Sequence, residues 1–248
     1  MLRRRDWLWM AAAAGSGVAG LCPLSIATAA EAVPRLTPPK NGPALVAVVV
    51  GEHNVVIDFA GPWEVFEGST LIGEMNGMQP PNMAWPKNQG FQLKMVSDRV
   101  KPLDAEGMII TPHYSFENFP AQPNVILIGE QGDPSPAKIA WIQKASQNAD
   151  LVMSVCTGAF LLAKTGLLDG LSATTHHDAY DAFQSQFPNV HLKRGVRFAD
   201  NGKVASSGGL SSGIELALRV VQRYYGENVS TAIAYWMEYN RSAHRPTA

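Results

Sequence analysis

Short apolar runs alternate with longer segments of mixed polarity along most of this 248-residue chain. An unbroken aliphatic run such as 44–50 is typical of a strand that is buried on both faces. Segment 61–71 instead places Val65, Phe66 and Leu71 on one helical stripe, with Pro62 in the first turn. The predicted strands are 44–50, 91–96, 108–111, 125–128 and 151–155, with short ones near Val196 and Val204; the predicted helices are 61–71, 138–147, 158–164, 178–187, 211–225 and 229–239.

Strands that alternate with helices predict an α/β fold with helices on both faces of a mostly parallel sheet. We therefore expect a three-layer sandwich formed by a single domain over 44–240. The preceding segment 31–43 is rich in proline and is predicted to be an extended lead-in. Segment 73–90, with its glycines and prolines, is predicted to be an irregular surface excursion.

The first 30 residues have the pattern of an export signal. Three arginines, at positions 3–5, precede an apolar stretch that ends in the small residues Ala-Thr-Ala-Ala at 27–30. The arginine pair followed by apolar residues resembles a twin-arginine signal, which predicts a periplasmic protein without a stable membrane span after signal removal. The alternative is an uncleaved N-terminal anchor. Removal of 1–30 takes away Cys22 and leaves Cys156 as the sole cysteine.

Composition narrows the classes of function. With 46% hydrophobic residues the chain has enough apolar surface to fold, which argues against disorder. Its net charge of −1 argues against a nucleic-acid partner, because phosphate contacts need a surplus of lysine and arginine. We expect a small molecule to be the partner.

Cys156 lies at the most informative point of the sequence. The predicted strand 151–155 delivers it into a tight turn, and a helix is predicted to begin at Gly158, which allows close backbone approach. Such an elbow exposes the side chain above the sheet edge, and the helix N-terminus is expected to lower the pKa of the thiol. Free backbone N–H groups there can hold an oxyanion. The alternative interpretation is an inert core cysteine.

Four motifs, in order along about residues 44–226, resemble the ThiJ/PfpI family of class I glutamine amidotransferase-like proteins. This resemblance implies a flavodoxin-like sheet with a nucleophile elbow, and a homodimer. The motifs are Asp-Phe-Ala-Gly-Pro-Trp-Glu-Val-Phe at 58–66, Cys-Thr-Gly at 156–158 with Leu-Leu-Ala-Lys-Thr-Gly-Leu-Leu-Asp-Gly at 161–170, Ala-Thr-Thr-His at 173–176, and Ser-Ser-Gly-Gly-Leu-Ser-Ser-Gly-Ile-Glu-Leu-Ala-Leu at 206–218.

The resemblance also implies residue roles. Cys156 matches the nucleophile, and Asp58 matches an acidic residue that contacts the thiol and could shuttle a proton. Thr157 follows the nucleophile, so its backbone N–H would face an oxyanion. His176 matches a histidine near the thiol that could act as a base or stabilise a thiolate. Gly129 would keep an amide near the site.

Structural interpretations of the same residues stay open. Asp58 is also suited to cap a helix or occupy its first turn. His176 is also suited to a hydrogen-bonded position in a strand-to-helix connection. Its neighbour His177 has no family match and is expected at the surface, and Glu64 is expected to satisfy backbone groups near the start of its helix.

Two departures from the family pattern define the expected branch. Thr157 stands where the intracellular peptidases carry histidine, which disfavours a peptidase and favours the isonitrile-hydratase branch and the sensing domains of AraC-type regulators. Gly129-Glu130 stands where relatives have a Pro-Gly-Gly turn that supplies an oxyanion donor. This change puts efficient turnover in question.

No metal and no organic cofactor is predicted. The sequence contains no glycine loop with the spacing of a phosphate cradle. Met75, Met78 and Met83 lie close together and could bind Cu(I), but no histidine or cysteine accompanies them, so they are better interpreted as anchors of a long loop.

Two functions follow from these features. The first is a cysteine-dependent hydratase (a lyase) or hydrolase in which Cys156 attacks a small electrophile such as an isonitrile, and water guided by Asp58 and Thr157 resolves the adduct. The second is a non-catalytic module that binds a ligand or senses redox stress through Cys156.

Overall fold

The computed structural model describes residues 33–74 and 90–239. The predicted export signal at 1–30 lies outside the described residues. Helix α1 (Val56–Glu74) includes positions 73 and 74, so the prediction that the irregular excursion begins at 73 is wrong. Positions 75–89 of that predicted excursion, with its methionines, lie outside the described residues. From Val33 onward the chain clusters as one compact unit.

A mostly parallel sheet of seven strands forms the centre of the described chain. Its spatial order is β10-β11-β7-β6-β1-β2-β5, and β10 alone runs antiparallel to its neighbour. The strands are β1 (Ala44–Val49), β2 (Phe91–Ser97), β5 (Tyr114–Ser115), β6 (Val125–Ile128), β7 (Leu151–Ser154), β10 (Phe198–Asp200) and β11 (Val204–Ser207). Strands β1, β6 and β7 lie side by side, so their carboxyl ends meet at one edge.

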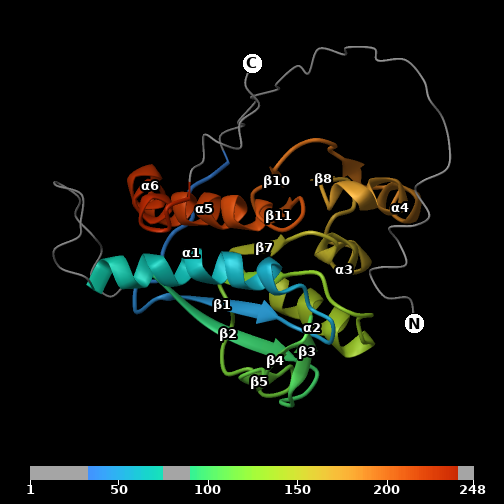
Figure 1. Ribbon diagram of the computed structural model, residues 1–248, viewed down its shortest axis with the longest axis horizontal. Coiled ribbons are helices and arrows are strands. Elements are labelled where there is room, and N and C mark those ends of the chain that lie inside the picture. The colour runs from blue at the N-terminus through green and yellow to red at the C-terminus, as the bar shows by residue number, and fades with distance from the viewer. Residues whose placement is uncertain (1–32, 75–89, 240–248) are drawn as a thin grey trace, which may run out of the picture. The chain divides into compact units, whose positions relative to one another are not determined.

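Helices cover both faces of this sheet, as predicted (Figure 1). Alternate side chains of β1 show the division, since Val46 and Val48 join the core under α1, α5 and α6, whereas Ala47 and Val49 join the core under α2, α3 and α4. The remaining helices are α2 (Pro136–Ser146), α3 (Gly158–Lys164), α4 (Tyr180–Gln186), α5 (Ser212–Tyr225) and α6 (Glu227–Trp236), with a 3-10 turn η2 (His177–Ala179). Over the described ranges, none of these helices combines the length and apolarity needed to cross a bilayer.

Helix α1 begins five residues before the predicted start, so the prediction that Pro62 lies in its first turn is wrong. Asp58 occupies the first turn instead. A proline inside a helix removes one backbone hydrogen bond. Close packing on α5 accompanies this defect, because a Cβ on Gly61 would lie 2.9 Å from Ile214 and one on Gly213 3.4 Å from Pro62.

Strands β3 (Leu103–Ala105), β5, β8 (Ser172–Ala173) and β9 (His191–Leu192) were not predicted, because they are only two or three residues long and carry no period-two pattern. Strand β4 (Met108–Ile110) matches the short strand predicted at 108–111. It forms a separate two-stranded sheet with β3, and β8 and β9 form another. The strand predicted near Val196 is β10, which begins two residues later.

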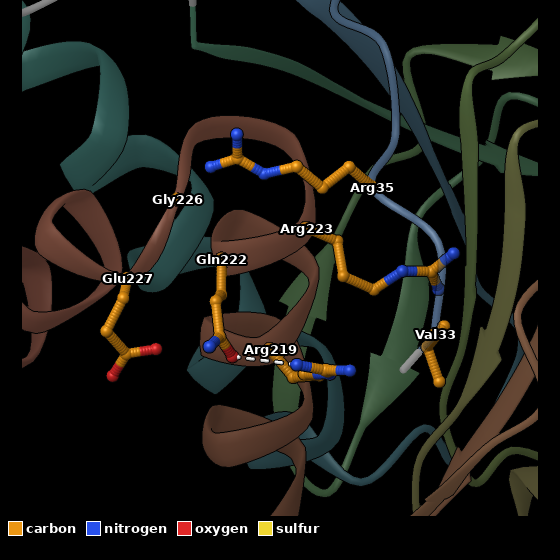
Figure 2. Close-up of a pocket in the computed structure, with 7 residues that line it drawn as sticks. All are labelled: Val33, Arg35, Arg219, Gln222, Arg223, Gly226 and Glu227. Carbon is orange, nitrogen blue, oxygen red and sulfur yellow. Dashed lines mark hydrogen bonds between the residues drawn. The ribbon is translucent and has the colours of Figure 1, made fainter. Parts of the chain in front are cut away.

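A buried arginine fastens the extended lead-in to α5. The Arg223 guanidinium donates to the Pro34 carbonyl oxygen at 3.2 Å, to Asp200 Oδ1 at 3.1 Å and to the Gly202 carbonyl oxygen at 2.6 Å. Arg219 donates to the other carboxylate oxygen of Asp200 at 3.2 Å. Figure 2 shows Arg219 and Arg223 at a surface hollow of about 250 Å³, which is lined by Val33, Arg35, Arg219, Gln222, Arg223, Gly226 and Glu227.

We predict that Arg223→Met lowers the free energy of unfolding by about 3–5 kcal/mol. The reason is that the buried Asp200 carboxylate loses one of its two arginine partners and keeps only Arg219. Arg194→Met is the matched control, since Arg194 pairs with Asp181 in an exposed position, and its effect should stay below about 1 kcal/mol. Urea denaturation measures both. Equal effects of the two substitutions would contradict the structural role of the buried pair.

Candidate active site

Cys156, just past the end of β7 at Ser154, adopts a left-handed backbone conformation. Its φ of 58° is unfavourable for a side chain with a Cβ and costs about 1–3 kcal/mol. Two bonds hold it in place: its N–H donates to the Gly208 carbonyl oxygen at 3.1 Å, and its own carbonyl oxygen accepts from Thr175 Oγ1 at 3.0 Å. This is the elbow predicted from the sequence, and strain maintained by the surrounding structure is frequent at functional sites.

Gly158 permits the elbow to approach the neighbouring strand. A Cβ at this position would lie 2.4 Å from the Ile128 carbonyl oxygen and 2.9 Å from the carbonyl carbon of Gly129. Both are backbone atoms, so relief of such a clash would require a shift of the main chain. Gly158 therefore lets α3 begin directly against the end of β6.

Three ionisable side chains converge at this sheet edge, where β1, β6 and β7 end. The Cys156 thiol donates to Glu130 Oε2 at 3.1 Å. Asp58, Glu130 and Cys156 each offer a ligand-type atom, and these atoms all lie within 4.8 Å of one another. The sheet order changes direction between β1 and β6, and open α/β sheets bind ligands at such a switch point.

The expected exposure of the Cys156 side chain and the expected lowering of its thiol pKa are both wrong. Cys156 is 1% exposed, and burial raises the pKa of its thiol above the usual value, with the charges of Asp58 and Glu130 adding to the effect. The backbone N–H of Thr157 acts in the opposite direction but is outweighed. The sequence identified the helix N-terminus but could not show the two carboxyl groups that face the sulfur.

Asp58 is fully buried, and burial raises its pKa to about 7. The backbone N–H of Glu130, which donates to Asp58 Oδ2 at 3.0 Å, lowers the pKa, whereas the nearby Glu130 side chain raises it. Asp58 Oδ1 is buried without a hydrogen-bond partner among the described residues. Asp58 can therefore both hold and release a proton near neutral pH.

Glu130 is a site residue to which the sequence analysis assigned no role, although it noted the Gly129-Glu130 turn. Its position just past the end of the buried strand β6, next to the strand that leads to Cys156, is the signal that could have assigned one. Two bonds hold the turn, because the Glu130 carbonyl oxygen accepts from Asn54 Nδ2 at 2.6 Å and from the N–H of Val55 at 3.0 Å.

A buried lysine supports the same turn from the other side. Lys138 Nζ donates to the Val50 carbonyl oxygen at 3.3 Å and to the side chain of Gln131. Gln131 Nε2 in turn donates to the carbonyl oxygens of Val49 at 3.2 Å and Gly129 at 3.3 Å. Burial lowers the pKa of Lys138, and the network ties the turn that carries Glu130 to the end of β1.

The other two predicted residues of the elbow region lie beside this cluster. Thr157 is the N-cap residue of α3, and its side chain makes no capping hydrogen bond. Gly129 packs against Asp58, since a Cβ there would lie 2.9 Å from that of Asp58. The N–H of Glu130 is directed to Asp58, so this turn places its amide on the carboxyl group.

His176 lies at the N-cap of η2, where its Nδ1 accepts from the N–H of Asp178 at 3.2 Å. Its ring packs on Gly209, next to the carbonyl group that holds Cys156. It forms a second group of possible ligands with His177 and Asp178. His177 is exposed, as expected, whereas Glu64 is exposed well inside α1 and so does not serve the helix start.

Residues 44–223 match the model of the DJ-1/PfpI family. The chain belongs to this family. The match covers the elbow, the Glu130 turn and the first turn of α1, so the strained cysteine and its carboxyl partners lie within the family domain.

Curated relatives carry two kinds of name. An HTH-type transcriptional regulator, GbdR of Pseudomonas aeruginosa, is 28% identical over 186 residues, which are 71% of this chain and 50% of the regulator. An isonitrile hydratase of Pseudomonas putida is 28% identical over 146 residues, which are 57% of this chain and 63% of that enzyme. The chain thus spans about half to two thirds of the length of these relatives.

Solved structures support the fold. A ThiJ/PfpI family protein from Pseudomonas syringae superposes with a TM-score of 0.66 at 20% identity, covering 88% of this chain and 86% of that one. DJ-1beta of Drosophila melanogaster superposes with a TM-score of 0.63 at 13% identity, covering 79% and 98%.

We predict that Glu130→Gln shifts the pH profile of Cys156 alkylation by iodoacetamide to lower pH, because removal of a charge beside the sulfur lowers the thiol pKa. The rate is measured by mass spectrometry of the Cys156 peptide. Glu64→Gln, which removes an exposed charge from α1, is the control and should match the wild type. A pH profile for Glu130→Gln equal to that of the control would contradict the coupling.

A second prediction concerns pH and stability. The Asp58 carboxyl group has a pKa of about 7 in the folded protein and about 3.9 in the unfolded chain. The folded state therefore binds this proton more tightly, and stability falls as pH rises from about 4 to about 7. Asp58→Asn has no such carboxyl proton to lose. The free energy of unfolding of the variant relative to the wild type should therefore increase by a few kcal/mol between about pH 4 and about pH 7, on the order given by the shift in the Asp58 pKa.

Urea denaturation at several pH values measures this difference. Asp181→Asn, at an exposed acid, should show a difference that does not change with pH. A constant difference for Asp58→Asn as well would show that Asp58 does not retain its proton in the folded protein.

Proposed function

We propose that this protein is a cysteine-dependent enzyme that hydrates small electrophiles of the isonitrile class. The proposal rests on one observation: of the two carboxyl groups beside the sulfur, one accepts the thiol proton in a hydrogen bond and the other retains its own proton near neutral pH. The thiol donates to Glu130, while the Asp58 carboxyl group, with a pKa of about 7, holds a proton for part of the time near neutrality. One group is thus placed to remove the proton of the thiol and the other to supply a proton.

The first step adds the thiol to the terminal carbon of the isonitrile. Glu130 accepts the S–H proton as the sulfur forms a bond to that carbon, and Asp58 delivers its proton to the same carbon. The product is a thioimidate on Cys156, with Glu130 protonated and Asp58 ionised. Because Glu130 accepts the proton during the attack, the raised thiol pKa does not require a standing thiolate.

The second step adds water to the thioimidate carbon. Asp58 accepts a proton from the water, and Glu130 returns its proton to the nitrogen, which restores both side chains. The tetrahedral adduct then loses its C–S bond, the O–H proton passes to the sulfur, and an N-substituted formamide leaves. The sum is one isonitrile and one water per formamide.

The backbone and the comparisons support this choice of substrate. The N–H of Thr157 faces the sulfur and would stabilise negative charge that develops there during addition and departure. The similarity to an isonitrile hydratase agrees with a small electrophile. We further propose a homodimer in the periplasm, exported through the signal-like segment 1–30.

A second candidate is a module that binds a ligand or senses oxidants without turnover. The burial of Cys156 favours it, because a protonated thiol in an apolar core reacts slowly. The similarity to transcriptional regulators agrees with a sensing domain. Cys156 would then be oxidised to sulfenic or sulfinic acid.

The test is an assay for formation of the formamide from an aryl isonitrile, with liquid chromatography to measure the product. We expect turnover by the wild type, loss of activity to background for Cys156→Ala, and a loss of about 100-fold for Asp58→Asn and Glu130→Gln. Glu64→Gln should retain full activity.

The same samples distinguish the two candidates. Formamide production no faster than with Cys156→Ala, together with no conversion of 2-oxoaldehydes, would overturn the enzyme. Gain of one or two oxygen atoms at Cys156 after peroxide treatment, seen by mass spectrometry, would then support the sensor.

A further inference from the structure

We propose that His176, His177 and Asp178 form a binding site for a divalent d-block cation such as Zn²⁺. In the structure, His176 Nδ1 lies 3.7 Å from Asp178 Oδ2, and His177 Nε2 lies 3.2 Å from Asp178 Oδ1. All three donor groups have an atom within 4.8 Å of the others. This site is separate from the group of Asp58, Glu130 and Cys156.

These distances are close to those of a metal site. Zinc binds imidazole nitrogen and carboxylate oxygen at about 2.0–2.2 Å, so neighbouring ligands of a tetrahedral ion lie about 3.3 Å apart. The His177–Asp178 pair, at 3.2 Å, already has this spacing, whereas the His176–Asp178 pair, at 3.7 Å, and the two imidazole nitrogens, which lie within 4.8 Å of each other, must move closer. Small side-chain rotations would therefore close three ligands around one ion.

One ligand is held and two are free to adjust. The His176 ring is wedged against Gly209, where a Cβ would fall 2.1 Å from its Cδ2 atom, and this packing keeps Nδ1 toward Asp178. The side chains of His177 and Asp178 are 73% and 76% exposed, so they can rotate toward a common ion. The two imidazole rings stack with centroids 4.4 Å apart, so His177 rotates out of this stack to direct a nitrogen at a shared ion.

The donor set selects the class of ion. Two imidazoles and one carboxylate suit Zn²⁺, Cu²⁺ or Ni²⁺, whereas Ca²⁺ and Mg²⁺ prefer oxygen ligands only. Three protein ligands leave a fourth position of a tetrahedral ion open to water or a ligand. An ion on His176 Nδ1 would replace the hydrogen bond from the N–H of Asp178, a loss of about 1 kcal/mol that metal coordination exceeds.

The site also adjoins the elbow. Thr175, which donates to the Cys156 carbonyl oxygen, is the residue before His176, and Gly208, which accepts from the Cys156 N–H, precedes the glycine under the His176 ring. A bound ion would therefore stabilise the two segments, at Thr175 and Gly208, that hydrogen-bond the backbone of Cys156.

The test is titration of the protein with Zn²⁺ in competition with a chromophoric chelator, in a Cys156→Ser background that removes the sulfur ligand. We expect one ion per chain, and a loss of affinity of at least about tenfold on His177→Ala and on Asp178→Asn. Both substituted side chains are exposed, so folding should be unaffected, and circular dichroism checks this.

Two matched controls use exposed residues outside the site. His191→Ala removes another histidine, and Asp181→Asn removes another acid, and both should retain the wild-type affinity. Equal affinity of His177→Ala, Asp178→Asn and the controls, or no binding of Zn²⁺ by the Cys156→Ser protein, would overturn the proposal. Neither result depends on isonitrile turnover, so the proposed enzyme and the metal site fail independently.

Discussion

The left-handed backbone at Cys156 is the constraint on which the candidate active site depends. A φ of 58° is unfavourable in isolation, and it persists because Gly208 and Thr175 bond both backbone polar groups of the residue. The conformation directs the side chain toward the ends of β6 and β1 rather than along β7. Gly158 is needed for the same reason, since any side chain there would strike the backbone of the neighbouring strand.

Burial determines which groups around Cys156 carry a proton at neutral pH. In water, two carboxyl groups and a thiol would leave two negative charges and a neutral sulfur at neutral pH. In this enclosed site the pKa of both Asp58 and the thiol rises, because charged forms lose hydration and lie close to one another. The result is a site that stores protons. That character suits a reaction in which protons move with each bond that forms or breaks.

Membership of the DJ-1/PfpI family defines the scaffold and leaves the reaction open. Relatives named as regulators and a relative named as a hydratase share similar levels of identity with this chain. The proposed reaction depends on the turn after β6. Glu130 directs a carboxyl group at the sulfur, and the Asn54, Gln131 and Lys138 network holds that turn in place.

The sequence by itself determined the layers of the fold and the elbow, because long apolar runs and the Cys-Thr-Gly turn are local patterns that need no partner. Helix α3 and strand β6 match their predicted bounds for this reason. Only the tertiary structure decided the start of α1, where packing against α5 tolerates Pro62 inside the helix. It also decided the protonation of the site. Residues 58, 130 and 156 are far apart in the chain, and their pKa values depend on burial and mutual distance, which no local pattern encodes.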